Sequence, residues 1–562
     1  MPDPLVPGTA SPVPVVLGPR AATTCARATH NEFDRTVPRP VRVASPARDR
    51  LLDAAAAHRE DVAARWARTG VPLLDLRHHA GDPAAHVAAT LRAVAARCEV
   101  VVGARLPDDV AGGRSGRVDA LVRDPGGGYH PCRTVRHKVL APRSATSHLE
   151  VVRTSRLGAP AHADAVGSAW VFRPREDDAV ALAHHWRVLQ ACGLAAPEPR
   201  GGLIGTDGLG GDDGSGGGGG DPVIAWRELD EPRFGRDGAQ GPASALGLHD
   251  DAHAARQRIA QVAGARTGHD DDPAPVVDPV GRKECTGCWW ESVCIEALPV
   301  DDLSRVLRGT LFPADYAQSA RAGIRTVEDL AALPAARLVT DDKAAQKRWA
   351  AARTSAGLVR EGLVVRRRPG RTPDVPRTAV EVDLDVESSA DGRVYLWGAL
   401  LTTAAGSAFH PFADLDVRDG AGERDLLVRC LTWLADEHPG ATVFHYSAVE
   451  RTAVRRILAT SAWAGADRAR GTSADPTTWV DLLPPVRGCL DSRSGHGLKV
   501  VAVHGAGFAW RDEAPDGWES QTWLEQARAG DAAAARRLLE YNEDDVRATL
   551  AVRDWLSPRD PA

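Results

Sequence analysis

Acidic and aliphatic residues alternate one by one between Glu381 and Ser388, where the chain reads Glu-Val-Asp-Leu-Asp-Val-Glu-Ser. On a β-strand, alternate side chains point to opposite faces, so the four acids share one face and the three aliphatic residues share the other. Four carboxylates on one face repel one another. Their oxygens are ligands that Mg²⁺ or Mn²⁺ prefer, so the pattern predicts a metal-binding strand face. The alternative is an acidic, solvated edge strand.

The residues after this strand predict a mixed α/β layer. A second strand is expected over 394–400, paired with the acidic strand as a hairpin, and a further strand over 441–447 leads to Glu450 at the start of a helix. The other expected elements are a helix over 424–436, a short element over 480–483 and a final helix over 532–556.

The first half of the chain also alternates between helical and strand patterns. Helices are expected over 46–68, 83–98, 178–194 and 248–265. Strands are expected over 99–103, 117–122 with Asp119 on it, 129–136 and 222–226. Between them, residues 201–221 are almost wholly Gly, Asp and Ser, a composition typical of a flexible, disordered insert.

A helical and basic segment separates the two halves. Residues 303–338 read as short helices, one of them capped by Thr326 with Asp329 three residues later. Residues 341–371 are rich in Lys and Arg. This run is either a solvated helix and linker or a surface that contacts nucleic-acid phosphates. The candidate nucleic-acid-binding residues are Lys343, Lys347 and Arg348.

Composition narrows the class of protein. The 562 residues are enough for about three domains. Apolar content of 43% and charged content of 26% are ordinary for a globular protein, and the net charge of −6 argues against a basic coat over the whole surface. We expect no membrane span and no secretory signal, and therefore a cytoplasmic protein.

Three of the nine cysteines form a C-x₂-C-x₅-C cluster at Cys285, Cys288 and Cys294. Thiolates at this spacing are typical of a zinc or iron–sulfur site, although buried free cysteines are the alternative. A fourth ligand is needed, and Cys25 is a distant candidate. A zinc-ribbon regulator is a further interpretation that rests on this cluster alone.

The acids of the last region could assemble one catalytic centre. The candidates are Asp385, Glu387, Glu450 and Asp545, with Tyr541 one helical turn before Asp545. Four carboxylates from separate elements can hold two divalent ions, which stabilise both the attacking and the leaving oxygen of a phosphodiester. A tyrosine beside the last acid can orient the attacking water.

These residues resemble the motifs of DEDD-type exonucleases of the RNase H-like fold, in the tyrosine subclass. The chain is more closely similar to the YprB-type RNase H-like domain in four segments: 443–450, 481–484, 497–501 and 541–546. The resemblance implies Asp385, Glu387 and Asp545 as metal ligands and Tyr541 as the residue that positions water. It departs at Glu450, where the family usually has Asp, so Asp383 and Asp481 are reserve ligands. Glu381 is expected to be an exposed charge at the strand entry.

The N-terminal half resembles RecB-family nucleases of the restriction-endonuclease-like PD-(D/E)XK fold, in the subgroup with one early and three late cysteines. This implies a [4Fe–4S] cluster on Cys25, Cys285, Cys288 and Cys294, with zinc as the alternative. Asp119 fits the first catalytic acid, but Thr134 stands where a second acid is required, and Arg136 replaces the lysine. This site is therefore expected to be degenerate.

The two halves together resemble a RecB-like nuclease family with a C-terminal RNase H-like domain. The predicted domains are 1–300 (RecB-like), 301–345 (helix-hairpin-helix-like), 346–376 (basic linker) and 377–562 (RNase H-like). We expect a metal-dependent nuclease, exonucleolytic on DNA or RNA, with chemistry in the C-terminal domain and nucleic-acid binding in the N-terminal domain. The alternative is a catalytically inactive nucleic-acid-binding or scaffold protein of a DNA repair or processing pathway.

Overall fold

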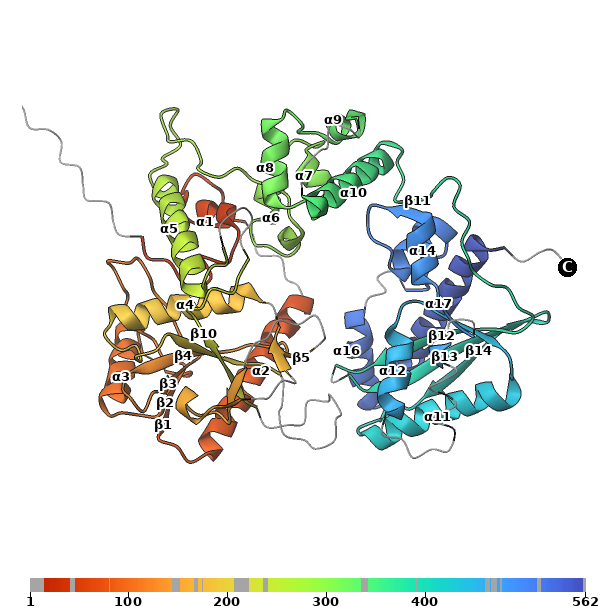
Figure 1. The fold of residues 1–562 in the computed structure, drawn as a ribbon, viewed down its shortest axis with the longest axis horizontal. Coiled ribbons are helices and arrows are strands. Elements are labelled where there is room, and N and C mark those ends of the chain that lie inside the picture. Colours follow the sequence, from red (N-terminus) through yellow and green to blue (C-terminus); the bar gives the residue numbers. More distant parts are fainter. Residues whose placement is uncertain are drawn as a thin grey trace, which may run out of the picture. The chain divides into compact units, whose positions relative to one another are not determined.

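The computed structural model describes residues 15–40, 46–79, 81–143, 152–165, 170–173, 175–206, 222–235, 241–334, 342–390, 392–459, 465, 469, 473–475, 478–512 and 517–558. Contacts divide the chain into two compact units. The first holds residues 1–279 with 288–294, and the second holds 280–287 with 295–562. Each unit is described here by itself (Figure 1).

The first unit is built on a mixed sheet with the strand order β1-β2-β3-β4-β9-β10-β6-β7 (Figure 1). In its centre, β4 pairs antiparallel with β3 and parallel with β9. The strands are β1 (Leu73–Asp75), β2 (Val100–Val102), β3 (Ala120–Arg123), β4 (Tyr129–Thr134), β6 (Arg153–Ser155), β7 (Asp164–Ala165), β9 (Arg200–Ile204) and β10 (Ile224–Glu228). Strands β5 (Leu140–Pro142) and β8 (Trp170–Phe172) pair separately.

Helices cover both faces of this sheet because its strands are apolar on both sides. Val100 and Val102 pack with Trp66 of α2 (Pro46–Arg68). Val101 and Leu121 pack on the opposite face, against α3 (Pro83–Ala95) and α4 (Glu176–Ala191). Helix α5 (Ala245–Gly264) lies on α4, and α1 (Ala26–Phe33) lies on α5. The mixed α/β class of this unit is as predicted, whereas its RecB-like fold stays a prediction.

Strand β9 corrects the predicted disordered insert. Gly201 to Ile204 lie inside the sheet between β4 and β10. A Cβ atom on Gly202 would approach Ile224 Cγ2 to 2.5 Å and Cys132 Sγ to 2.6 Å, so glycine is required there by packing rather than by flexibility. The rest of the predicted insert, residues 207–221, lies outside the described residues.

The second unit begins with a small helical region. Helices α7 (Leu303–Val306), α8 (Pro313–Arg321), α9 (Val327–Ala332) and α10 (Lys343–Arg360) share one apolar core. The capping box of Thr326 and Asp329 at α9 is confirmed. Ala345, Trp349 and Ala352 of α10 are buried in this core, so the predicted linker 346–376 contains most of a packed helix. The domain boundaries themselves stay predictions.

The last region holds the sheet β14-β13-β12-β15-β16. Strands β12 (Glu381–Ser388), β13 (Val394–Thr403) and β14 (Gly406–Ala413) are antiparallel, while β15 (Thr442–His445) and β16 (Trp479–Asp481) continue parallel to β12. Helices α11 (Gly420–Glu437) and α12 (Val449–Leu458) cover one face, and α17 (Ala532–Leu556) covers the other, beside α16 (Gly517–Arg528). The hairpin and the alternation of strands and helices are as predicted.

Candidate active site

The acidic strand β12 divides its side chains as its sequence requires. Val382 and Leu384 are buried in the core formed with α11 and α12. The acids point to the other face, where α17 packs across β12. Carboxylate oxygens of Asp385, Glu387 and Asp545 lie within 4.8 Å of one another. The structure therefore brings together three of the predicted metal ligands from two elements that lie far apart in the sequence, β12 and α17.

The protein around these acids makes their charged forms costly. Desolvation raises the pKa of Asp385 well above its ordinary value, and the neighbouring charges of Asp545, Glu387 and Glu450 raise it further. Desolvation and the charge of Asp545 likewise raise the pKa of Glu387. Asp385 and Glu387 stay partly open to solvent although protein atoms surround them. A group of acids that is desolvated yet reachable is a favourable place for a divalent cation.

Two neighbours hold the carboxylates in place. Asn542 Nδ2 donates a hydrogen bond of 2.7 Å to Asp385 Oδ2. Trp510 Nε1 donates a hydrogen bond of 2.8 Å to Asp545 Oδ1. The residue opposite Asp385 on β13 is Gly398. Because glycine has no Cβ atom, the Asn542 side chain can lie directly over this position. Tyr541 also hydrogen-bonds Asp545.

Tyr541 lies in the same group and is tied to a lysine. Lys499 Nζ donates a hydrogen bond of 2.8 Å to Tyr541 Oη and lies 4.9 Å from the centre of the ring. The positive charge of Lys499 lowers the pKa of Asp545 against the desolvation that raises it. Lys499 belongs to α15 (Leu498–Val501), which continues into a π-helical turn over Ala502–Ala506, a feature frequent at functional sites.

Glu450 lies beside this group without joining it. It is buried in the first turn of α12, and its Oε2 atom is 3.5 Å from His445 Nδ1. Burial raises the pKa of Glu450, while the hydrogen bond and charge of His445 lower it. Its charge acts on Asp385, but the oxygens within 4.8 Å of one another are those of Asp385, Glu387 and Asp545. The predicted role of Glu450 as a catalytic carboxylate stays a prediction.

Three further acids, Glu381, Asp383 and Asp481, make contacts within the protein. Glu381 was expected to be exposed, but it is fully buried and paired with Arg553 of α17. Asp383 is also paired with Arg553, with 2.6 Å between Nη2 and Oδ2. Asp481 Oδ1 accepts hydrogen bonds from the backbone N–H groups of Ser447 and Leu483. Asp383 is therefore engaged by Arg553, whereas the reserve role of Asp481, of which these contacts use one oxygen, stays a prediction.

The loop that carries Trp510 is anchored to α17, the helix that carries Asp545. Arg511 donates from its backbone N–H and from Nε to Asp544, at 2.9 and 2.8 Å. Residues that sequence reasoning did not assign to the site are Gly398, Lys499, Trp510 and Asn542. Asn542 and Lys499 both lie within segments that carry the family resemblance, so the sequence drew attention to these segments without assigning a role to either residue. Nothing in the local pattern marked Gly398 or Trp510.

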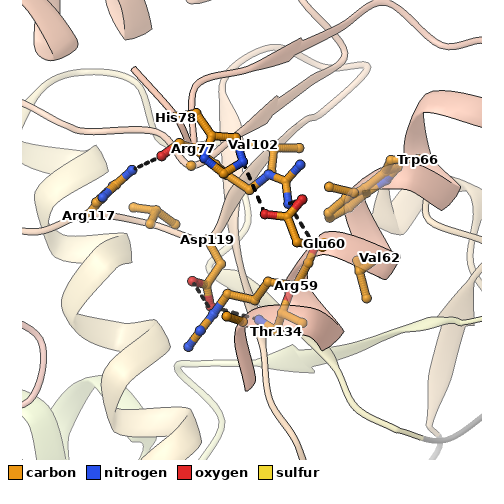
Figure 2. Close-up of a pocket in the computed structure, with 14 residues that line it drawn as sticks. Arg59, Glu60, Val62, Trp66, Arg77, His78, Val102, Arg117, Asp119 and Thr134 are labelled. Carbon is orange, nitrogen blue, oxygen red and sulfur yellow. Dashed lines mark hydrogen bonds and ion pairs between the residues drawn. The ribbon is translucent and has the colours of Figure 1, made fainter. Parts of the chain in front are cut away.

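The N-terminal unit has its own pocket, of about 400 Å³, where Asp119 and Thr134 lie together (Figure 2). Asp119 precedes β3 rather than lying within it. Its Oδ2 atom accepts a hydrogen bond of 2.9 Å from the Thr134 N–H, and its Oδ1 atom is 3.5 Å from Arg59 Nε. Glu60 also lines the pocket but is paired with Arg77 and with a histidine, as the dashed lines in Figure 2 show. Among the described residues, no second carboxylate completes a metal-ligand group with Asp119.

The predicted cationic residues differ in their surroundings. Arg136 is exposed just beyond β4, and Lys343 and Lys347 are exposed on α10. Arg348 instead makes a bidentate ion pair with Asp315, with Nε 2.9 Å and Nη2 3.2 Å from the carboxylate oxygens. Arg348 therefore stabilises the helical region and is poorly placed for phosphate contact.

Cys25, Cys288 and Cys294 belong to the first unit. Cys25 precedes α1, and Cys294 Sγ accepts a hydrogen bond of 3.4 Å from Asn31 Nδ2. Burial raises the pKa of Cys294, and the neighbouring thiols Cys25 and Cys288 add to this effect. Within the part of the chain that is described, these sulfur atoms do not form a group of potential ligands within 4.8 Å of one another.

The sheet order and the carboxylates on its central strand and last helix define the C-terminal region as an α/β domain built around a candidate metal site. Residues 383–557 match the family model RNase_H_2, of the RNase H superfamily. This match confirms the predicted RNase H-like C-terminal region and indicates a nuclease-like function there. No match was found among curated proteins or among solved structures. Within the described residues, no helix has both the length and the apolar character that crossing a membrane requires.

Proposed function

We propose that the protein is a metal-dependent nuclease that hydrolyses phosphodiester bonds of DNA or RNA, with a DEDD-type exonucleolytic site in its C-terminal domain. The observation that carries this proposal is the grouping of Asp385, Glu387 and Asp545 within 4.8 Å. Oxygen donors of this kind fit Mg²⁺ or Mn²⁺. The nuclease-like fold of residues 383–557 supports a nucleic-acid substrate.

Each residue of the site has a physical role in this proposal. Asp385, Glu387 and Asp545 hold divalent ions, and Glu450 supplies a fourth negative charge nearby. When bound, such ions stabilise the charge that develops on the scissile phosphate. The hydroxyl of Tyr541 accepts a hydrogen bond from Lys499 and shares one with Asp545, which holds it beside the proposed metal ligands, where it can position the attacking water.

The N-terminal unit is proposed to bind nucleic acid without cutting it. Asp119 is paired with Arg59 and accepts a hydrogen bond from the Thr134 N–H. The arginine thus lies where a metal ion would otherwise balance the charge of this carboxylate. The exposed Arg136, Lys343 and Lys347 can contact phosphates. The C-x₂-C-x₅-C spacing supports a [4Fe–4S] cluster with Cys25 as the fourth ligand, and zinc is the alternative.

Asp385→Asn tests the catalytic proposal. The substitution keeps the shape of the side chain and removes a charged metal ligand, so we expect loss of at least about 10²-fold in rate, the scale of a lost charge-stabilising group. Labelled single- and double-stranded DNA and RNA are incubated with Mg²⁺ or Mn²⁺, and product length gives the exonucleolytic pattern.

The matched control is Glu540→Gln, a carboxylate on α17, the helix that carries Asp545; its side chain is 43% exposed. It is expected to keep wild-type activity. Equal degradation by wild type and Asp385→Asn would contradict the assignment. Binding of nucleic acid without cleavage by the wild type under every condition would favour the inactive scaffold instead.

A further inference from the structure

A group of buried histidines lies in the N-terminal unit, away from the pocket that holds Asp119. His184 lies on α4, and His249 and His253 lie one turn apart on α5, which packs on α4. One ring nitrogen from each histidine lies within 4.8 Å of the other two. The three side chains are 0%, 0% and 3% exposed. Neither the proposed chemistry nor the pocket of Figure 2 uses them.

The outer nitrogen of each ring contacts a fixed oxygen. His184 Nε2 is 2.7 Å from Ser115 O, His249 Nδ1 is 2.9 Å from Asp250 Oδ1, and His253 Nε2 is 3.0 Å from Gly112 O. Carbonyl and carboxylate oxygens only accept hydrogen bonds, so the outer nitrogens of His184 and His249 carry the proton. His253 Nε2 also lies 3.2 Å from the amide nitrogen of Gln257; that nitrogen donates to Gly113 O at 3.1 Å, and a proton on His253 Nε2 has Gly112 O as its acceptor. The other nitrogen of each neutral ring then carries a lone pair.

The inner nitrogens face one another without a donor between them. His184 Nδ1 and His249 Nε2 are 3.2 Å apart, and both are acceptors in these tautomers. His253 Nδ1 is buried and has no hydrogen-bond partner among the described residues. Burial lowers the pKa of all three rings. Opposed lone pairs at this distance are unfavourable unless a cation lies among them.

We propose that His184, His249 and His253 bind a divalent transition-metal ion, best matched by Zn²⁺. Imidazole nitrogens suit zinc, and three histidines leave one position of a tetrahedral site for water. Contacts from outer nitrogens to a carboxylate and to backbone carbonyls are the surroundings that metal-binding histidines usually have. Hard ions such as Mg²⁺ prefer oxygen, so this site and the carboxylate site select different metals.

The site has a structural consequence. Ser115 and Gly112 belong to the loop between β2 and β3, so the bound ion would tie this loop and α5 to α4. A Cβ atom on Gly113 would lie 1.7 Å from Gln257 Nε2, so the loop already approaches α5 as closely as glycine allows. We therefore expect the ion to stabilise the fold rather than to meet substrate.

Metal content of the full-length chain tests the proposal. Zinc is measured by mass spectrometry in the wild type, in His253→Ala and in the control His185→Gln. His185 is the neighbour of His184 and is equally buried, but it lies outside the group. We expect the wild type and His185→Gln to hold one more zinc ion per chain than His253→Ala, and added Zn²⁺ to raise the Tm of these two alone.

Cobalt distinguishes this site from the cysteines. Co²⁺ bound by the histidines gives visible d–d bands without the charge-transfer absorption of a cobalt–thiolate bond. These bands should be lost in His253→Ala and in the milder His249→Gln, each shown to be folded by circular dichroism. Equal zinc content and equal cobalt spectra in the wild type and a folded variant would overturn the proposal.

Discussion

Gly398 is predicted to control the active site although it carries no side chain. A Cβ atom at this position would lie 1.7 Å from Asn542 Oδ1 and 2.7 Å from Asn542 Cγ. Ordinary contacts begin near 3.4 Å, so Gly398→Ala must move the Asn542 side chain by well over 1 Å. The hydrogen bond of 2.7 Å from Asn542 to Asp385 cannot survive that displacement.

Two costs follow from the substitution. Overpacking a buried position typically costs about 1–3 kcal/mol of the free energy of unfolding. Loss of a hydrogen bond to a charged carboxylate is worth about 1.5–3 kcal/mol, and here it removes the group that orients a metal ligand. We therefore expect Gly398→Ala to lower both stability and nuclease rate, the latter by about tenfold or more, as 1.4 kcal/mol corresponds to tenfold.

A double-mutant cycle identifies the cause. Denaturant unfolding and the nuclease assay are applied to Gly398→Ala, Asn542→Ala and the double variant. If the clash is with Asn542, adding Gly398→Ala to the Asn542→Ala background should cost little stability, because the obstructing side chain is gone. Equal costs in both backgrounds, or full activity in Gly398→Ala, would refute this reasoning.

Two further predictions concern the charges around the site. Arg553→Met should lower the free energy of unfolding by about 3–5 kcal/mol, because it leaves Asp383 buried without its cation and Glu381 with Arg377 alone. Adding Asp383→Asn should recover part of the loss in urea unfolding, and no recovery would contradict the ion-pair account. Lys499→Met should reduce the nuclease rate while leaving the circular dichroism spectrum and Tm close to wild type, because it removes the donor to Tyr541 at the half-buried edge of the site; full activity would exclude a role for this lysine.

The alternation along β12 was sufficient to predict the strand and its acidic face. It could not predict how deeply each acid on that face is buried. Glu381 and Asp385 share one face, yet the first is sealed under Arg553 and the second is partly open. A two-residue alternation shows only which face of the strand a side chain is on. How exposed the side chain is depends on how far α17 extends over the strand.

Composition was a poor guide where packing sets the residue type. The glycines at the start of residues 201–221 were interpreted as flexible, but Gly202 is small because Ile224 and Cys132 crowd it within the sheet. The histidine group shows a different limit. The spacing of His249 and His253 on one helix was visible in the sequence, but His184 joins them only through the packing of α4 on α5.

The acidic face of β12 is best understood by how each acid is neutralised. At the entry, Arg553 supplies a permanent cation to Glu381 and Asp383 from within the chain. At the exit, Asp385 and Glu387 face Asp545 instead, with Lys499 as a nearby positive charge held by Tyr541. Uncompensated negative charge is thus confined to the end of the strand that solvent reaches. In the proposed function, an exchangeable divalent ion would bind at this end, where a nucleic-acid phosphate can also approach.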